Sequence, residues 1–146
     1  MTNRITLSNT EKLSLISNLS TMLSAGLPIL SAIESLSEEE KGNSKKILET
    51  VHADLLQGRH LYVSFAKFPN VFDKVTVNIV RGAEEAGQLA TILKDLKEQM
   101  RKEMEFNDKI RSALIYPVLI LITMLGILII ILVVAVPKIA SVFEKL

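Results

Sequence analysis

The chain has 146 residues, and its 17 Lys and Arg residues nearly balance its 16 Asp and Glu residues, which leaves a net charge of +1. This near-neutral charge excludes the broad basic surface of a nucleic-acid-binding protein, so no nucleic acid is expected as a partner. The chain contains no cysteine, which excludes disulfides and thiolate metal sites and agrees with a reducing compartment.

The first predicted element is a helix that starts at Ser8. Ser8 and Glu11 have the spacing of a capping box, and apolar residues recur every three or four positions after them. Gly26 is expected to end this helix. Pro28 suits the first turn of a second and shorter helix.

A charged run separates the second helix from a third. The run at residues 38–41 is predicted to be a solvated loop. Asn43 or Ser44 can then cap the third helix, whose apolar stripe continues until Gly58.

Three further helices are predicted before the apolar C-terminal region. Residues 61–66 form one or two turns before a break at Phe68 and Pro69, because the residue before a proline is disfavoured in helical geometry. Residues 71–80 contain several valines, which allow a strand, but a lone strand would have no partner and we expect a helix. Residues 88–116 then continue at the helical period without glycine or proline.

These elements predict an all-α fold. Short links join about six amphipathic helices, and an up-and-down bundle buries their apolar stripes most simply. We therefore expect a six-helix bundle domain over residues 1–112, followed by a transmembrane helix.

The membrane span is predicted from the apolar run between Pro117 and Val136. This run has no charged residue, and its length at about 1.5 Å per residue matches a hydrocarbon core of about 30 Å. We expect the transmembrane helix over residues 113–136, in contact with membrane lipid. Tyr116 and Pro117 mark the boundary at the membrane entry, and Pro137 marks the other boundary.

The charges on either side of the span predict its orientation. More Lys and Arg residues precede the span closely than follow it; they are Arg101, Lys102, Lys109 and Arg111 before it and Lys138 and Lys145 after it. By the positive-inside rule, residues 1–112 lie in the cytoplasm and residues 137–146 form a short extracytoplasmic tail.

The stretch EEAGQL, residues 84–89, places two carboxylates beside a glycine. If Gly87 is the left-handed residue that ends a helix, both glutamates lie in the last turn, where negative charge opposes the helix dipole. A salt bridge from Arg81 or a lysine, or a partner, must then compensate Glu84. If Gly82 is the break instead, both glutamates begin the next helix and their charge is favourable.

Catalysis and metal binding find little support in the sequence. The spacing of His52, His60, Glu84 and Glu85 matches no acid–base arrangement, so no catalytic residue and no cofactor are expected. Neighbouring glutamates point about 100° apart on a helix, so they bind a hard cation only if other groups complete the site. We therefore expect no metal-binding residue within one chain, and a second subunit would have to supply the remaining ligands.

The chain resembles the inner-membrane platform proteins of type II secretion systems and type IV pili, the F/PilC family. The resemblance covers nearly the whole length and rests on the order and spacing of several segments. They are SNLSTMLSAGLPILSAIESL (17–36), GRHLYVSFAKFPNVF (58–72), AEEAGQLATIL (83–93), KIRSALIYPVLIL (109–121) and VPKIASVF (136–143).

The family pattern Gly-Glu-x-x-Gly-x-Leu falls on the 84–89 stretch. Its glutamate corresponds to Glu84, its second glycine to Gly87 and its leucine to Leu89, whereas its first glycine falls on Ala83. The resemblance implies an ordered helix junction with a carboxylate available to a partner. The expected partner-binding residues are Glu84, Glu85, Gly87, Gln88 and Leu89.

The resemblance also implies a function without catalysis. Platform proteins of this family contact a cytoplasmic assembly ATPase and help to add pilin or pseudopilin subunits to a filament at the inner membrane. The family architecture has two cytoplasmic domains, so this chain corresponds to one half. A homo-oligomer such as a dimer is expected, since Gly126 allows close helix approach within the span.

The sequence allows two other functions. One alternative is a membrane-anchored helical bundle for signalling or oligomerisation, and the other is a membrane-bound hydrolase that uses Glu84 and Glu85. The sequence lacks a convergent base, nucleophile or phosphate loop for the latter. Secretion, pilus extension and DNA uptake are not distinguished.

Overall fold

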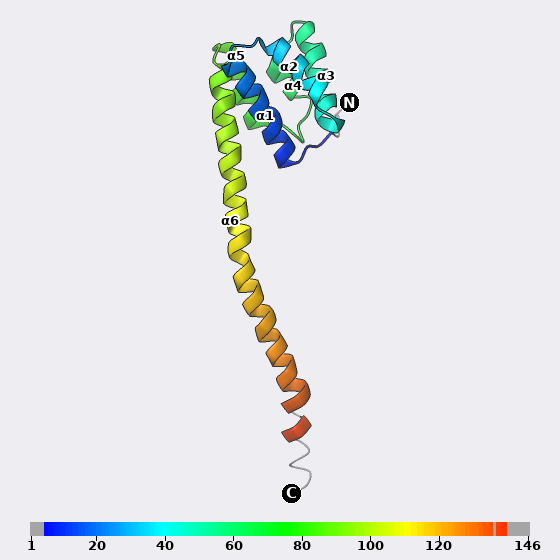
Figure 1. Ribbon diagram of the computed structural model, residues 1–146, viewed down its shortest axis with the longest axis vertical. Coiled ribbons are helices and arrows are strands. Elements are labelled where there is room, and N and C mark those ends of the chain that lie inside the picture. Colours follow the sequence, from blue (N-terminus) through cyan, green and yellow to red (C-terminus); the bar gives the residue numbers. More distant parts are fainter. Residues whose placement is uncertain (1–4, 136, 140–146) are drawn as a thin grey trace. The chain divides into compact units, whose positions relative to one another are not determined.

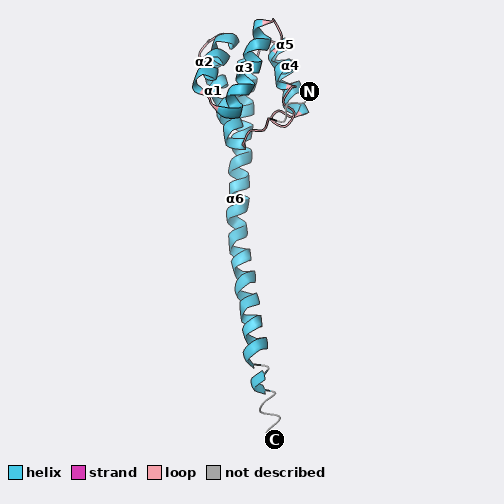
Figure 2. Cartoon of the chain, turned by 90° about the vertical axis from the view of Figure 1, so that its right-hand side faces the viewer, coloured by secondary structure: helices cyan, strands magenta, loops and turns pink. Residues whose placement is uncertain are grey.

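The computed structural model describes residues 5–135 and 137–139. Within these residues it contains six α-helices, one π-helical stretch and no strand, which confirms the all-α fold (Figure 2). The elements are α1 (Asn9–Ser24), α2 (Ile29–Glu39), α3 (Gly42–Leu56), α4 (Leu61–Phe65), α5 (Lys74–Glu85), α6 (Leu89–Ile130) and the π-helical η1 (Ile131–Ala135) (Figure 1).

The chain divides into two compact units, residues 1–104 and 105–146, and α6 contributes to both. The first unit holds α1 to α5 and the start of α6. The domain limits expected at residues 112 and 136 stay predictions. Of the expected tail, residues 140–146 lie outside the described residues.

The core of the first unit is formed by aliphatic and aromatic side chains from all of its helices. The rings of Phe65 and Phe72 stack with their centroids 3.9 Å apart. The largest side chains that are fully buried are Leu15, Ile16, Leu19, Ile33, Leu36, Ile47, Leu48, Leu61, Phe65, Phe68, Phe72 and Leu93. Burial of these apolar side chains is the main source of stability for helices this short.

The start of α1 has the predicted capping box. Ser8 Oγ accepts a hydrogen bond from the Glu11 amide at 3.2 Å, and the Glu11 carboxylate accepts one from the Ser8 amide at 2.8 Å. Gly26 follows α1 with a φ of 86°, as expected for a helix-terminating glycine. Pro28 is the N-cap of α2 rather than a residue of its first turn.

The predictions for the region between α2 and α3 are partly wrong. Helix α2 continues to Glu39, so half of the charged run is helical rather than a loop. The N-cap of α3 is Lys41, and neither Asn43 nor Ser44 caps the helix, because both lie within its first turn. The side-chain amide of Asn43 (Nδ2) instead donates to the Thr6 carbonyl at 3.0 Å, and Ser44 is buried.

The segment between α4 and α5 shows why the valine-rich stretch is helical. Asp73 accepts a hydrogen bond from the Thr76 amide at 2.8 Å and so caps α5. Val71 and Phe72 precede the helix and are buried in the core. The short helix α4 and the break at Pro69 agree with the predictions.

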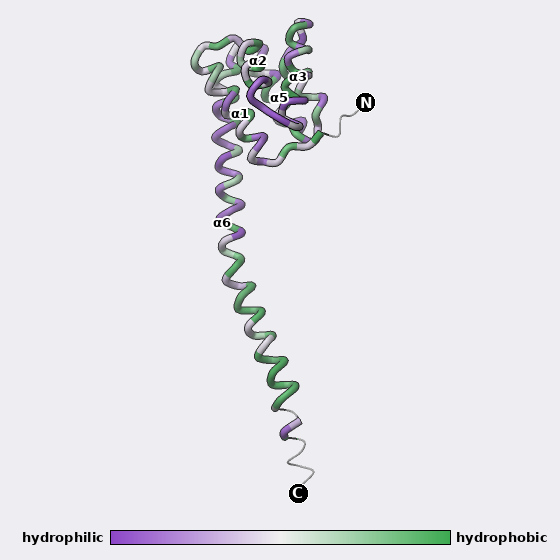
Figure 3. The backbone as a smooth tube through the Cα atoms, turned by 45° about the vertical axis from the view of Figure 1, so that its right-hand side comes forward, coloured by the Kyte–Doolittle hydropathy of each residue, from purple (hydrophilic) through white to green (hydrophobic). Residues whose placement is uncertain are grey.

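Helix α6 continues through Pro117 to Ile130. Its sequence changes from hydrophilic to hydrophobic along its length, as Figure 3 shows. By length and composition, residues 89–139 contain a window that is long and apolar enough to cross a membrane. Tyr116 and Pro117 lie where the polar part of the helix gives way to the apolar part, and their boundary role stays a prediction.

Candidate functional site

The junction between α5 and α6 is built around Gly87. Gly87 has a φ of 68°, and the Gln88 amide donates to the Ala83 carbonyl at 2.8 Å. The Gly87 amide donates to the Glu84 carbonyl at 3.2 Å, which completes a Schellman motif at the end of α5. Of the two breaks considered, Gly87 is therefore the correct one, and Gly82 lies inside α5.

Glu84 binds the start of α4. Its carboxylate accepts hydrogen bonds from the amides of Leu61 at 2.9 Å and Tyr62 at 3.3 Å. His60 Nδ1 lies 3.2 Å from the same carboxylate. His60 is the N-cap of α4 and provides no side-chain cap, so Glu84 supplies the missing acceptor from α5.

This contact changes the interpretation of the two glutamates. The backbone amides of α4 compensate Glu84, in place of the expected salt bridge from Arg81 or a lysine. Arg81 Nε instead donates to Glu85 at 2.9 Å, and both side chains are more than half exposed. The hydrogen bond to Glu85 and the charge of Glu85 raise the pKa of Arg81.

Two aromatic rings and a guanidinium group lie beside Glu84. The His60 ring stacks on the Tyr62 ring with centroids 5.5 Å apart, and the Arg81 guanidinium lies 5.6 Å from the Tyr62 centroid. We call the surface formed by His60, Tyr62, Arg81, Glu85 and Gln88 the junction surface. It combines the ring of Tyr62 with the guanidinium of Arg81, and tyrosine and arginine are both enriched where proteins bind one another.

The structure separates the five residues predicted to bind a partner into two groups. Glu85, Gly87 and Gln88 are exposed and accessible to a partner. Glu84 is only 17% exposed and is bound within the protein, and Leu89 packs against the core. Glu84 therefore positions the junction surface, whereas the exposed residues form it.

A second polar cluster lies beneath the turn between α3 and α4. The buried Asp54 carboxylate accepts hydrogen bonds from Arg59 Nη1 at 2.8 Å, Ser64 Oγ at 2.9 Å and Lys67 Nζ. Burial raises the pKa of Asp54, but the hydrogen bonds from Lys67 and Ser64 and the charges of Lys67 and Arg59 together lower it below its usual range. Asp54 is therefore ionised at neutral pH.

The two clusters together hold α4 in place. Glu84 of α5 binds the first amides of α4, and Asp54 of α3 binds Ser64 within α4 and Lys67 just after it. Helix α4 has only five residues, too few to be stable alone. These carboxylates fix its position between α3 and α5.

The geometry gives Glu84 a structural role, and the contacts of Glu84 and Glu85 are made within the protein. The structure does bring His60 and Glu84 together, although they are distant in sequence, but both Glu84 oxygens already accept hydrogen bonds. Glu85 is paired with Arg81. Within the described residues, no three His, Cys, Asp or Glu side chains are grouped to hold a metal ion.

Sequence reasoning missed both carboxylate clusters. One signal was available for Glu84: His60 precedes a short helix and has no side-chain oxygen to cap it, so the acceptor had to come from elsewhere. For Asp54 the signal was an acidic residue near the end of a helix with basic residues soon after it. Neither pattern identifies the partner without the fold.

We expect Glu84→Gln to lower the stability of the bundle by about 1 to 2 kcal/mol. The glutamine oxygen can accept from one amide of α4, but its NH2 group would then face the other amide, donor against donor. Thermal unfolding followed by circular dichroism measures this loss. Glu85→Gln, at an exposed position, is the control and should change little. Equal melting temperatures for the two variants would contradict the capping role.

Comparison with known proteins gives a consistent result. Residues 15–137 match the family described as type II secretion system (T2SS), protein F. The type II secretion system protein F of Aeromonas hydrophila is 31% identical over 140 residues, which cover 94% of this chain and 36% of that protein.

Pilus proteins are similar to the same extent. The type IV pilus assembly protein PilC of Thermus thermophilus is 35% identical over 129 residues, covering 88% of this chain and 32% of that protein. PilC of Pseudomonas aeruginosa is 30% identical over 127 residues, covering 86% and 34%. The chain spans about a third of the length of these relatives.

Proposed function

Because this chain belongs to the family of type II secretion system protein F, we propose that it acts as a platform in the inner membrane for filament assembly. In this proposal it performs no catalysis. It couples a cytoplasmic assembly ATPase to the addition of pilin or pseudopilin subunits. The match to residues 15–137, which includes most of the bundle and the apolar part of α6, is the observation that carries the proposal.

The junction surface is the proposed docking site for the ATPase. Its exposed groups come from the turn before α4, from α5 and from the turn into α6, and the Gly87 turn and the Glu84 cap fix their positions. A surface held by a rigid support loses little conformational entropy on binding. Because the junction surface carries charges of both signs, it favours a partner surface with charges at complementary positions rather than an apolar groove.

Charge reversal at Glu85 tests this docking site. We expect Glu85→Lys to weaken binding of the assembly ATPase by about tenfold, because a rim charge of the wrong sign is repelled by the partner. Affinity is measured between purified ATPase and the chain in detergent micelles. Lys45→Glu on α3, also exposed, is the matched control. Unchanged binding by Glu85→Lys would place the docking site elsewhere, and absence of binding by the unmodified chain would contradict the ATPase partnership.

The proposed orientation has a separate test. Glu49→Cys on α3 and Ser141→Cys give the cysteine-free chain single reporters before and after the span; Glu49 is exposed, whereas Ser141 lies outside the described residues. With a membrane-impermeant maleimide on intact cells, we expect the cysteine at 141 to be labelled and the one at 49 to be protected. Labelling of the cysteine at 49 alone would reverse the orientation and exclude a cytoplasmic partner for the bundle.

A further inference from the structure

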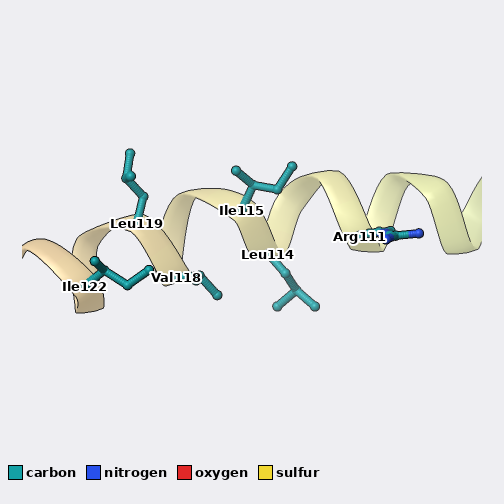
Figure 4. Close-up of a pocket in the computed structure, with 6 residues that line it drawn as sticks. All are labelled: Arg111, Leu114, Ile115, Val118, Leu119 and Ile122. Carbon is teal, nitrogen blue, oxygen red and sulfur yellow. The ribbon is translucent and has the colours of Figure 1, made fainter.

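A groove runs along one face of α6 at the start of its apolar part. It is lined by Arg111, Leu114, Ile115, Val118, Leu119 and Ile122 and has a volume of about 350 Å³. Figure 4 shows Ile115 and Leu119 on one side of the helix, Leu114 and Val118 on the other, and Arg111 extending away from them along the helix. The groove therefore has apolar walls and one cationic end.

The cationic end is formed by Arg111. Arg111 takes part in no ion pair in the described part of the chain, even though Asp108 lies one turn before it. Helical side chains lean toward the N-terminus, so the guanidinium is directed away from the apolar run. An arginine at the polar end of a membrane span places its charge at the level of the lipid headgroups.

We propose that this groove binds one anionic phospholipid. Arg111 contacts the lipid phosphate, and an acyl chain lies between two apolar rows, one formed by Ile115 and Leu119 and the other by Leu114 and Val118. The guanidinium fork matches phosphate oxygens in a bidentate contact. The distance along the helix from Arg111 to Ile122 is about 16 Å, at 1.5 Å per residue, so the apolar rows follow an acyl chain through much of one leaflet. The site does not depend on the ATPase partnership.

Lys109 provides a control for the position of the charge. It lies two residues from Arg111 and therefore on about the opposite face of the helix, outside the groove. Lys109→Gln and Arg111→Gln remove the same charge at nearly the same depth. If anionic lipid is attracted only by the overall charge of this segment, lipid binding should fall equally in both variants. If the groove is a specific site, lipid binding should fall only in Arg111→Gln.

The experiment compares phosphatidylglycerol with phosphatidylcholine on the full chain in detergent micelles, with native mass spectrometry counting bound lipid. We expect the unmodified chain to prefer phosphatidylglycerol about fivefold, the ratio that one basic residue supplies near an anionic surface. Arg111→Gln should abolish this preference, Arg111→Lys should retain only part of it because an ammonium group makes no bidentate contact, and Lys109→Gln should retain most of it.

A second pair of variants tests the apolar rows. Val118→Trp fills the groove and should reduce binding of both lipids, whereas Ile120→Trp lies on the opposite face and should not. Equal losses for Lys109→Gln and Arg111→Gln would overturn the proposal in favour of diffuse attraction. If Val118→Trp instead separates an oligomer and leaves lipid binding unchanged, the groove holds another helix and the proposal is also wrong.

Discussion

Replacing Asp54 with asparagine should destabilise the bundle by about 2 to 3 kcal/mol, since it removes the negative charge and leaves a single oxygen where two now accept from a buried hydroxyl and two cations. Asp54 is 5% exposed and binds groups that precede α4, lie within it and follow it. Arg59 and Lys67 are 48% and 38% exposed, so water can solvate them after the substitution. This access places the loss below that of a fully buried ion pair.

The same carboxylate predicts how stability depends on pH. The pKa of Asp54 is lower in the folded protein than in the unfolded chain, where a free aspartate titrates at about 3.9. Its contribution is therefore complete above that value and is lost as the pH falls toward the folded pKa. Below about pH 4 the unmodified bundle should lose stability more steeply than Asp54→Asn, which has no carboxylate to protonate at this position.

Chemical unfolding of residues 1–112 at neutral and acidic pH measures both effects. Glu49→Gln is the matched control, because Glu49 lies on the same helix but is exposed, and it should change stability little. A difference between unmodified protein and Asp54→Asn that is the same at pH 7 and pH 3 would exclude an ionised Asp54 as the source of the stability.

The fold was largely predictable because its signals are local. Ser8 and Glu11 interact across three residues, and Gly26 and Gly87 end helices through bonds within a single turn. The apolar run after Pro117 is recognisable from composition alone. The helix start near Asn43 was predicted wrongly, since a polar residue beside a helix end can also bond to a distant segment, as Asn43 does to Thr6.

The site was less predictable because its contacts are distant in sequence. Glu84 lies 23 residues from Leu61, and the pairing depends on how α4 packs against α5. The pattern identified the 84–89 stretch as a junction, but it could not show that one glutamate faces inward and the other outward. Their directions follow from adjacent positions on a helix, about 100° apart, once the buried face of α5 is known.

Gly87→Val should cost about 1 to 3 kcal/mol and misplace the junction surface. At a φ of 68° a β-branched residue meets its own backbone, even though no other atom lies within 4 Å of the position that a Cβ would occupy. The expected loss is therefore conformational strain rather than a clash with neighbours. Glu84 lies three residues before Gly87. Strain at Gly87 should therefore also weaken the hydrogen bonds between the Glu84 carboxylate and the start of α4.

Two matched variants separate strain from other causes. Gly87→Asn should retain most of the stability, since asparagine tolerates the left-handed region far better than valine. Gly82→Ala, inside α5 and with open space at its Cβ position, should leave stability unchanged or raise it by up to about 1 kcal/mol. The order of melting temperatures expected for the bundle is thus Gly82→Ala highest, Gly87→Asn intermediate and Gly87→Val lowest. If valine at position 87 is tolerated as well as asparagine, the left-handed turn is not what fixes the junction, and the docking site proposed there loses its rigid support.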